Sequence, residues 1–292
     1  MRHVASLLLV GFGAALSAQA PVTLQQVMAS ATRAPDQVIR YGEAPEQFGH
    51  LRLPHGPGPF PVVVFIHGGC WLSQFGIEHA APLEQAFADS GYAVWSLEYR
   101  RVGNPGGGWP GTFRDIAAGA DHLRTVARQH PLDLTRVIAS GHSAGGFFAL
   151  WLAARHKLPV GSELRDPDPL RVHGVLALAP APDLEGLHQA GVCGKVINGL
   201  MGGSPMEVPA RYATASLMQL APIDVPTEAV IGEADASWAP VGRAYARRAT
   251  EAGDRKLHVV EVPGAGHFDV IAPFAPAWRA VMDGLRALSS RR

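Results

Sequence analysis

Residues 136–146, Arg-Val-Ile-Ala-Ser-Gly-His-Ser-Ala-Gly-Gly, decide the fold that the sequence predicts. A short strand-like stretch at 136–139 leads into Gly-x-Ser-x-Gly at 141–145, and an apolar helical stretch follows at 144–154. A serine on such a tight strand-to-helix turn is forced into a strained backbone conformation, so its neighbours must carry no obstructing side chain. The pattern therefore predicts Ser143 as a nucleophile exposed at the end of a strand.

Strands and helices alternate on both sides of this turn. Continuous β-branched runs indicate buried strands, and apolar residues spaced three and four apart indicate helices. We expect strands at 38–42, 47–53, 61–66, 92–99, 136–139, 172–178, 227–231 and 257–262, and helices at 81–90, 113–127, 144–154, 241–252 and 277–288. This order predicts an α/β fold with a mostly parallel central sheet and helices on both faces.

Residues 183–224 interrupt this alternation with glycine-rich turns and short helical pieces between two strands. We interpret this segment as a small cap or lid insertion. The chain has 292 residues, near the upper limit for one hydrophobic core, so residues 21–292 are expected to form a single domain.

A serine hydroxyl is a poor nucleophile unless a base takes its proton. The chain contains 13 histidines, and His267 is the best placed of them. It follows the last predicted strand in the turn Val-Pro-Gly-Ala-Gly-His at 262–267, which delivers it to the carboxyl edge of the sheet, where ligands bind. His142 is expected to be a packing residue, and His67 to brace its loop.

The base needs an acid that fixes its tautomer and stabilises the imidazolium. Asp235 follows the predicted strand at 227–231 and is the expected acid, with Glu233 and Asp269 as rivals. The chain order of nucleophile, acid and base is then the order found in α/β-hydrolases.

A possible oxyanion hole precedes the serine turn. His-Gly-Gly-Cys-Trp at 67–71 follows the buried strand at 61–66. The backbone N–H groups of Gly68 and Gly69 can approach a developing negative oxygen without a side-chain clash, and the second donor is the N–H of Ala144.

Together these motifs resemble one branch of the α/β-hydrolase fold. His-Gly-Gly-Cys-Trp at 67–71, Gly-His-Ser-Ala-Gly-Gly at 141–146, Gly-x-x-Asp at 232–235 and His-Phe at 267–268 look like the kynurenine formamidase (arylformamidase) branch. They look equally like neighbouring small carboxylesterases, including a bacterial feruloyl-esterase-like group. The resemblance covers nearly all of the chain after the first twenty residues. It implies the nucleophile Ser143, the base His267, the acid Asp235 and the backbone donors Gly68, Gly69 and Ala144.

Composition excludes several classes of partner and cofactor. The chain carries 25 Lys and Arg against 25 Asp and Glu, so it lacks the basic excess that nucleic acids or anionic membranes call for. It has no His-Glu-x-x-His and no clustered Cys/His spacing, so neither a metal nor a cofactor is expected. The expected partner is a small-molecule ester.

Residues 1–20 have the three-part pattern of a signal peptide: a short positive start, an apolar stretch and small residues at cleavage spacing. Cleavage after Ala18 or after Ala20 is open, and a membrane anchor is the alternative interpretation. We expect an exported protein, periplasmic or secreted, with no membrane insertion after cleavage.

Export makes the two cysteines a candidate disulfide. Cys70 lies on the loop at 67–71, and Cys193 lies in the insertion, which is expected to rise over the same edge of the sheet. We expect the two residues to be close, and a disulfide and two free thiols both remain open.

Aromatic residues near these loops suggest an apolar substrate pocket. The candidates are Trp71, Trp109, Trp238 and Phe268. The sequence thus predicts an exported serine hydrolase that cleaves small carboxylic esters, short-chain or aryl, through an acyl-enzyme. An aryl formamidase is the enzymatic alternative, and a catalytically inactive binding protein is the alternative of a different class.

Overall fold

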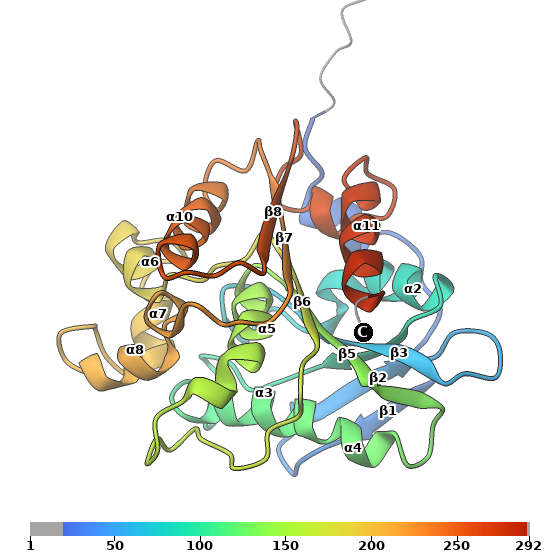
Figure 1. Ribbon diagram of the computed structural model, residues 1–292, viewed down its shortest axis with the longest axis horizontal. Coiled ribbons are helices and arrows are strands. Elements are labelled where there is room, and N and C mark those ends of the chain that lie inside the picture. The colour runs from blue at the N-terminus through green and yellow to red at the C-terminus, as the bar shows by residue number, and fades with distance from the viewer. Residues whose placement is uncertain (1–19, 291–292) are drawn as a thin grey trace, which may run out of the picture.

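The structure is a computed structural model that describes residues 20–290. Its centre is one eight-stranded sheet of order β1-β2-β4-β3-β5-β6-β7-β8 (Figure 1). β1 pairs with β2 and β2 with β4 in antiparallel fashion, and every other pair is parallel. The strands are β1 Gln37–Arg40, β2 Phe48–Arg52, β3 Phe60–Ile66, β4 Ala93–Leu97, β5 Leu132–His142, β6 Gly174–Leu178, β7 Thr227–Gly232 and β8 Leu257–Val262. The predicted mostly parallel α/β fold is confirmed.

Helices cover both faces of the sheet (Figure 1). α2 Ala81–Asp89 and α11 Trp278–Ser289 pack on one face, and α3 Gly111–Asp121, α5 Ala144–Ala154 and α10 Ala239–Glu251 on the other. β3 shows why both faces are apolar. Successive side chains of a strand point to opposite faces, so Val62, Val64 and Ile66 join the α5 side while Val63 and Phe65 join the α11 side.

The helix expected at 113–127 is instead two helices, α3 and α4 Leu123–Val126, which meet at His122. The Trp95 indole Nε1 donates to the Gly119 carbonyl at 2.8 Å. That carbonyl is the one that would accept from the Leu123 N–H in an uninterrupted α-helix. A tertiary contact therefore competes for the carbonyl at this junction.

β5 is longer than expected, because residues 132–133 also pair with β3 before a register shift between Pro61 and Val62. A short N-terminal helix, α1 Leu24–Met28, was not anticipated at all. Its capping box is visible in the sequence as Thr23 and Gln26, so a search for such boxes would have found it.

The insertion at 183–224 forms four short helices, α6 Leu184–Ala190, α7 Val196–Met201, α8 Pro209–Ala215 and α9 Leu217–Leu220. Their buried residues, including Leu187, Ile197 and Leu217, belong to the same apolar cluster as α5 and the sheet. In Figure 1 this group lies beside α10 on the α5 side of the sheet. The segment is thus packed into the main core.

The signal-peptide prediction concerns residues that lie almost entirely outside the described range of 20–290. Within that range, no helix has the length and apolar character needed to cross a bilayer.

Candidate active site

Ser143, Asp235 and His267 come from three different strand ends. Ser143 lies between β5 and α5, Asp235 follows β7, and His267 follows β8. Because these strands are parallel, their carboxyl ends share one edge of the sheet. The His267 ring donates from Nδ1 to Asp235 Oδ2 at 2.6 Å, while Asp235 Oδ1 accepts from the Trp238 N–H at 3.1 Å.

Ser143 and His267 line one small cavity of about 140 Å³. Most of the other lining groups are apolar or aromatic. The full set is Leu24, Gly69, Cys70, Phe75, His79, Ser143, Trp238, His267 and Phe268. A hydroxyl and an imidazole therefore line the same mostly apolar cavity, and the imidazole is bonded on its other side to a carboxylate.

The turn that carries Ser143 is strained, as the Gly-x-Ser-x-Gly pattern predicts. Ser143 has φ 57° and ψ −118°, in the positive-φ region that L-residues avoid. A Cβ on Gly145 would lie 2.0 Å from the Ile66 carbonyl oxygen, and one on Gly141 would lie 2.3 Å from the Gly145 oxygen. Only glycine fits at either position, because the obstructing atoms are backbone.

The loop at 67–71 lies against this turn and is braced from behind. His67 donates from Nδ1 to the Gly68 carbonyl at 2.8 Å, and the Tyr99 hydroxyl donates to the His67 carbonyl at 3.0 Å. Burial, with the Arg101 charge adding to it, lowers the pKa of His67 to about 3, so the ring is neutral. His67 therefore has the bracing position expected for it. Gly69 lines the cavity, and Ala144, at the start of α5, is fully buried.

His142 does more than pack. Its Nε2 lies 2.9 Å from the His267 carbonyl oxygen, which can only accept, so this nitrogen carries the proton. Its Nδ1 must then accept from His79 Nε2 at 2.8 Å. Burial holds the pKa of His142 well below its usual range and lowers that of His79 to about 3, so both rings are neutral. The pair fixes the backbone of His267.

The two rival carboxylates hold backbone groups instead of the imidazole. Asp269 Oδ2 accepts from the N–H groups of Gly266 and Val22, each at 2.9 Å. Glu233 Oε2 accepts from the Gly264 N–H at 3.3 Å. Among the residues 20–290, the carboxylate bonded to the His267 ring is Asp235.

The aromatic candidates divide into two pairs. Trp238 stacks on His267 with ring centroids 5.3 Å apart, and Phe268 also lines the cavity. Trp71 and Trp109 do not line it, which corrects the prediction for these two residues. Trp71 is fully buried with its ring edge-on to Phe147, and the Trp109 indole donates to Glu163 at 2.7 Å.

Cys70 and Cys193 are joined in a disulfide, with Cα atoms 5.8 Å apart. The bond ties the turn between α6 and α7 of the insertion to the loop at 67–71. Of the described residues that line the cavity beside Ser143, none comes from 183–224. The insertion is instead bonded to Cys70, a residue that lines the cavity.

Sequence reasoning missed Leu24. It comes from the segment next to the predicted cleavage site, far from every motif, and it lines the cavity with Ser143 and His267. Only the folded chain brings it there.

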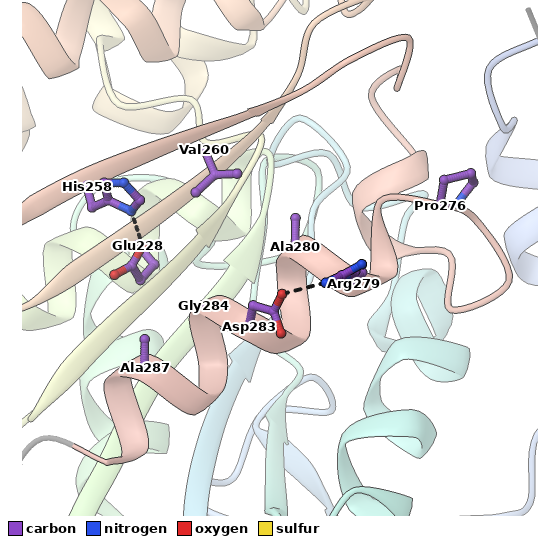
Figure 2. A pocket seen from close by; sticks show the side chains of 9 residues that line it. All are labelled: Glu228, His258, Val260, Pro276, Arg279, Ala280, Asp283, Gly284 and Ala287. Atoms are coloured by element: carbon purple, nitrogen blue, oxygen red, sulfur yellow. Dashed lines mark hydrogen bonds and ion pairs between the residues drawn. The ribbon is translucent and has the colours of Figure 1, made fainter.

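A second cavity of about 460 Å³ lies between α11 and strands β7 and β8 (Figure 2). Figure 2 shows His258 bonded to Glu228, at 2.6 Å, and Arg279 paired with Asp283. This second cavity has no hydroxyl or thiol nucleophile among its lining residues. Although it is larger than the cavity beside Ser143, it is therefore not the reaction site. Within 20–290, no group of three His, Cys, Asp or Glu residues is arranged to hold a metal ion.

Comparison with known proteins supports an esterase. The BD-FAE family model matches residues 51–240, more than half of the chain. Esterase B from Lactobacillus rhamnosis, solved with a C4-C4 SN3 tributyrin phosphonate, has a TM-score of 0.77 at 22% identity, over 90% of this chain and 89% of that one.

Two further structures are similar. A bacterial heroin esterase has a TM-score of 0.68 at 23% identity, covering 91% of this chain and 87% of that one. Esterase 2 from Thermogutta terrifontis has a TM-score of 0.64 at 20% identity, covering 85% and 89%. These likenesses bear on the fold. No curated protein matches the chain.

Proposed function

This chain belongs to the BD-FAE family and is a carboxylic ester hydrolase of the α/β-hydrolase fold, and we propose that it cleaves small esters through Ser143, His267 and Asp235. One observation carries the proposal. The His267 ring is bonded to a buried carboxylate at 2.6 Å and shares a cavity of about 140 Å³ with a serine in the strained conformation of a nucleophile turn.

In the proposed mechanism, the Ser143 oxygen attacks the ester carbonyl carbon while its proton passes to His267 Nε2. Asp235 holds the Nδ1 proton and stabilises the imidazolium that forms. The carbonyl oxygen becomes negative and is stabilised by backbone N–H groups of the loop at 68–70 and of Ala144. The tetrahedral intermediate collapses, the C–O bond breaks, and the alcohol leaves with the proton from His267.

A water molecule then repeats the sequence on the acyl-enzyme. His267 takes a proton from the water, the resulting hydroxide attacks the acyl carbon, and Ser143 leaves with the proton returned by His267. The products are a carboxylic acid and the free enzyme. No step needs a metal or a cofactor.

The cavity favours short acyl groups. Its volume of about 140 Å³ is below the 300–1,000 Å³ typical of ligand pockets, and its walls are mostly apolar or aromatic. The similar esterase B was solved with a phosphonate related to tributyrin, a C4 ester. We therefore infer a preference for acetyl to butyryl esters of apolar or aromatic alcohols over chains of about ten carbons.

Export belongs to the same proposal. The N-terminal sequence pattern supports a cleaved signal peptide, and a disulfide suits an oxidising compartment such as the periplasm. The protein would then meet its ester outside the cytoplasm.

A fluorophosphonate probe tests the mechanism. We expect stoichiometric labelling of the wild-type protein and none of Ser143→Ala at equal fold stability. An unlabelled wild-type protein would indicate an inactive hydrolase fold that acts as a binding module, and would overturn the mechanism.

A substrate panel tests the class of ester. We expect kcat/KM for an aryl butyrate to exceed the values for an aryl decanoate and for N-formylkynurenine under the same conditions. The formamide is included because the His-Gly-Gly-Cys-Trp motif at 67–71 also resembles formamidases. A clear preference for the formamide would keep the mechanism and replace the esterase assignment, and a clear preference for the decanoate would point to a lipase.

A further inference from the structure

The segment at 21–28 is docked against the loop that carries His267. The Val22 N–H donates to Asp269 Oδ2 at 2.9 Å in a buried bond, and the same oxygen accepts from Gly266. Pro21 lies so close to Gly266 that a Cβ on that glycine would be 2.6 Å from the proline Cβ. Figure 1 shows this start of the chain beside the loop that follows β8.

Apolar packing and a capping box fix the segment beyond Val22. The Thr23 hydroxyl accepts from the Gln26 N–H at 3.2 Å, and the Gln26 side chain accepts from the Thr23 N–H at 2.8 Å. Val27 is fully buried in the apolar cluster that contains Leu83 and Phe87 of α2. The first turn of α1 is therefore held at both ends.

Leu24 lies between these two anchors, half-buried, and its side chain lines the cavity that contains Ser143 and His267. It is the aliphatic side chain among the nine lining residues, and it comes from a segment that is more than a hundred residues away from the serine. Removing it would extend a cavity of only about 140 Å³.

We propose that the Leu24 side chain forms part of the wall of the substrate pocket and limits the length of the acyl chain that the enzyme accepts. Asp269 is the positioning residue of this wall, because it bonds the segment to the loop that carries His267. The inference rests on the proposed esterase function. It gives the N-terminal segment a direct part in substrate choice.

The test compares four variants of the full chain on aryl acetate, butyrate and octanoate. A single methylene in an apolar pocket is worth roughly 10- to 200-fold in discrimination. We expect Leu24→Ala to raise the octanoate-to-acetate ratio of kcat/KM by about tenfold or more. Leu24→Trp should lower the butyrate-to-acetate ratio by a similar factor.

Gln25→Ala is the matched control, because Gln25 is the next residue of α1, is exposed and does not line the cavity. It should keep the wild-type ratios. Asp269→Ala removes the oxygen that accepts from both the Val22 and the Gly266 N–H groups, so it should shift the ratios in the direction of Leu24→Ala, by a smaller factor.

Fluorophosphonate labelling separates this inference from the function on which it rests. Full labelling of Leu24→Ala with wild-type chain-length ratios would overturn the role of Leu24 and leave the esterase mechanism intact. Absent labelling of the wild-type protein would instead overturn the mechanism. A shift of equal size in Gln25→Ala would show a general loosening of α1 and would also overturn the inference.

Discussion

The serine turn and the insertion at 183–224 both lie near the carboxyl edge of the sheet, but they are built differently. At the turn, backbone atoms of Ile66, Gly141 and Gly145 approach one another so closely that no side chain fits between them. The insertion is four short helices held by apolar packing and by one covalent bond to Cys70. The turn fixes the position of reacting atoms, whereas the insertion contributes buried surface.

This difference predicts two kinds of mutational effect. Substitutions at the turn, at Asp235 and at His267 should reduce activity by removing a reacting group or by distorting the turn. Changes in the insertion should reduce stability and leave the chemistry nearly intact.

Removing the nucleophile or the base should have the largest effect. Ser143→Ala or His267→Ala should lower kcat by several orders of magnitude, because each removal disables the whole unit. Asp235→Ala should lower kcat by a smaller factor. Steady-state kinetics on an aryl acetate give the measurement.

The rival carboxylates are the controls for that series. Glu233→Ala and Asp269→Ala should stay within about tenfold on the short ester, the change that corresponds to ~1.4 kcal/mol in the barrier. If Asp269→Ala proves as damaging as Asp235→Ala, the assignment of the acid is wrong or the role is shared.

A single methyl group should be enough to distort the turn. In Gly145→Ala the new Cβ would meet the Ile66 carbonyl oxygen at 2.0 Å, so the backbone must shift. A displacement of about 1 Å at a reacting group can cost 10²-fold, and we expect kcat/KM to fall by at least that factor.

Gly161→Ala is the control, because a Cβ there meets nothing within 4 Å, and any effect comes from its backbone φ of 90° and not from a steric contact. It should lower the free energy of unfolding by about 1–2 kcal/mol and leave kcat unchanged. Equal activity of the two variants would mean that close packing at the turn does not matter for catalysis.

The disulfide should matter for stability and hardly for chemistry. It closes a loop over a sequence separation of 123 residues. On the chain-entropy account, its loss in Cys70→Ser/Cys193→Ser lowers the free energy of unfolding by up to about 4–5 kcal/mol. We expect kcat on an aryl acetate to stay within about tenfold, with urea unfolding as the stability measurement.

Intact mass with and without reductant checks that the bond exists in protein produced in an oxidising compartment. Two free thiols there would remove the covalent link between the two regions. A loss of kcat as large as that of Gly145→Ala would show that the insertion also positions the reacting atoms.

The smallest expected effect is on the pH dependence of stability. Burial lowers the pKa of His67 and of His79 from 6.5 to about 3 in the folded protein. Between those values the unfolded chain binds more protons, so stability falls as the pH drops from 6.5 toward 3. Each histidine contributes a slope of up to about 1.4 kcal/mol per pH unit.

Glu84 acts in the opposite sense. Burial raises its pKa from 4.5 to about 7, so its contribution makes the protein more stable as the pH falls from 7 to 4.5. Urea unfolding at pH 7, 5.5 and 4.5 should show a net loss of stability, with a steeper loss in Glu84→Gln. A rise in wild-type stability toward acid would contradict the neutral, buried state of the two histidines.

Local rules explain what could be predicted from the sequence. The alternation of strands and helices follows from side-chain periodicity, and the turn at 141–145 follows from the steric needs of its serine. The order of Ser143, Asp235 and His267 along the chain, each after a strand, was enough to expect them at one sheet edge. These inferences need only neighbouring residues and the direction of the strands.

The tertiary structure decided the rest, because the deciding contacts join residues that are far apart in sequence. It placed Asp235, and not Asp269, on the His267 ring, and it turned Asp269 toward Val22. The cavity beside Ser143 is lined by Leu24, and not by Trp71 or Trp109 as the sequence predicted. The Trp95 indole donates to the Gly119 carbonyl near the end of α3. Cys70 and Cys193, 123 residues apart in sequence, are joined in a disulfide. Such choices depend on which surfaces pack together, and no periodicity or short motif encodes that packing.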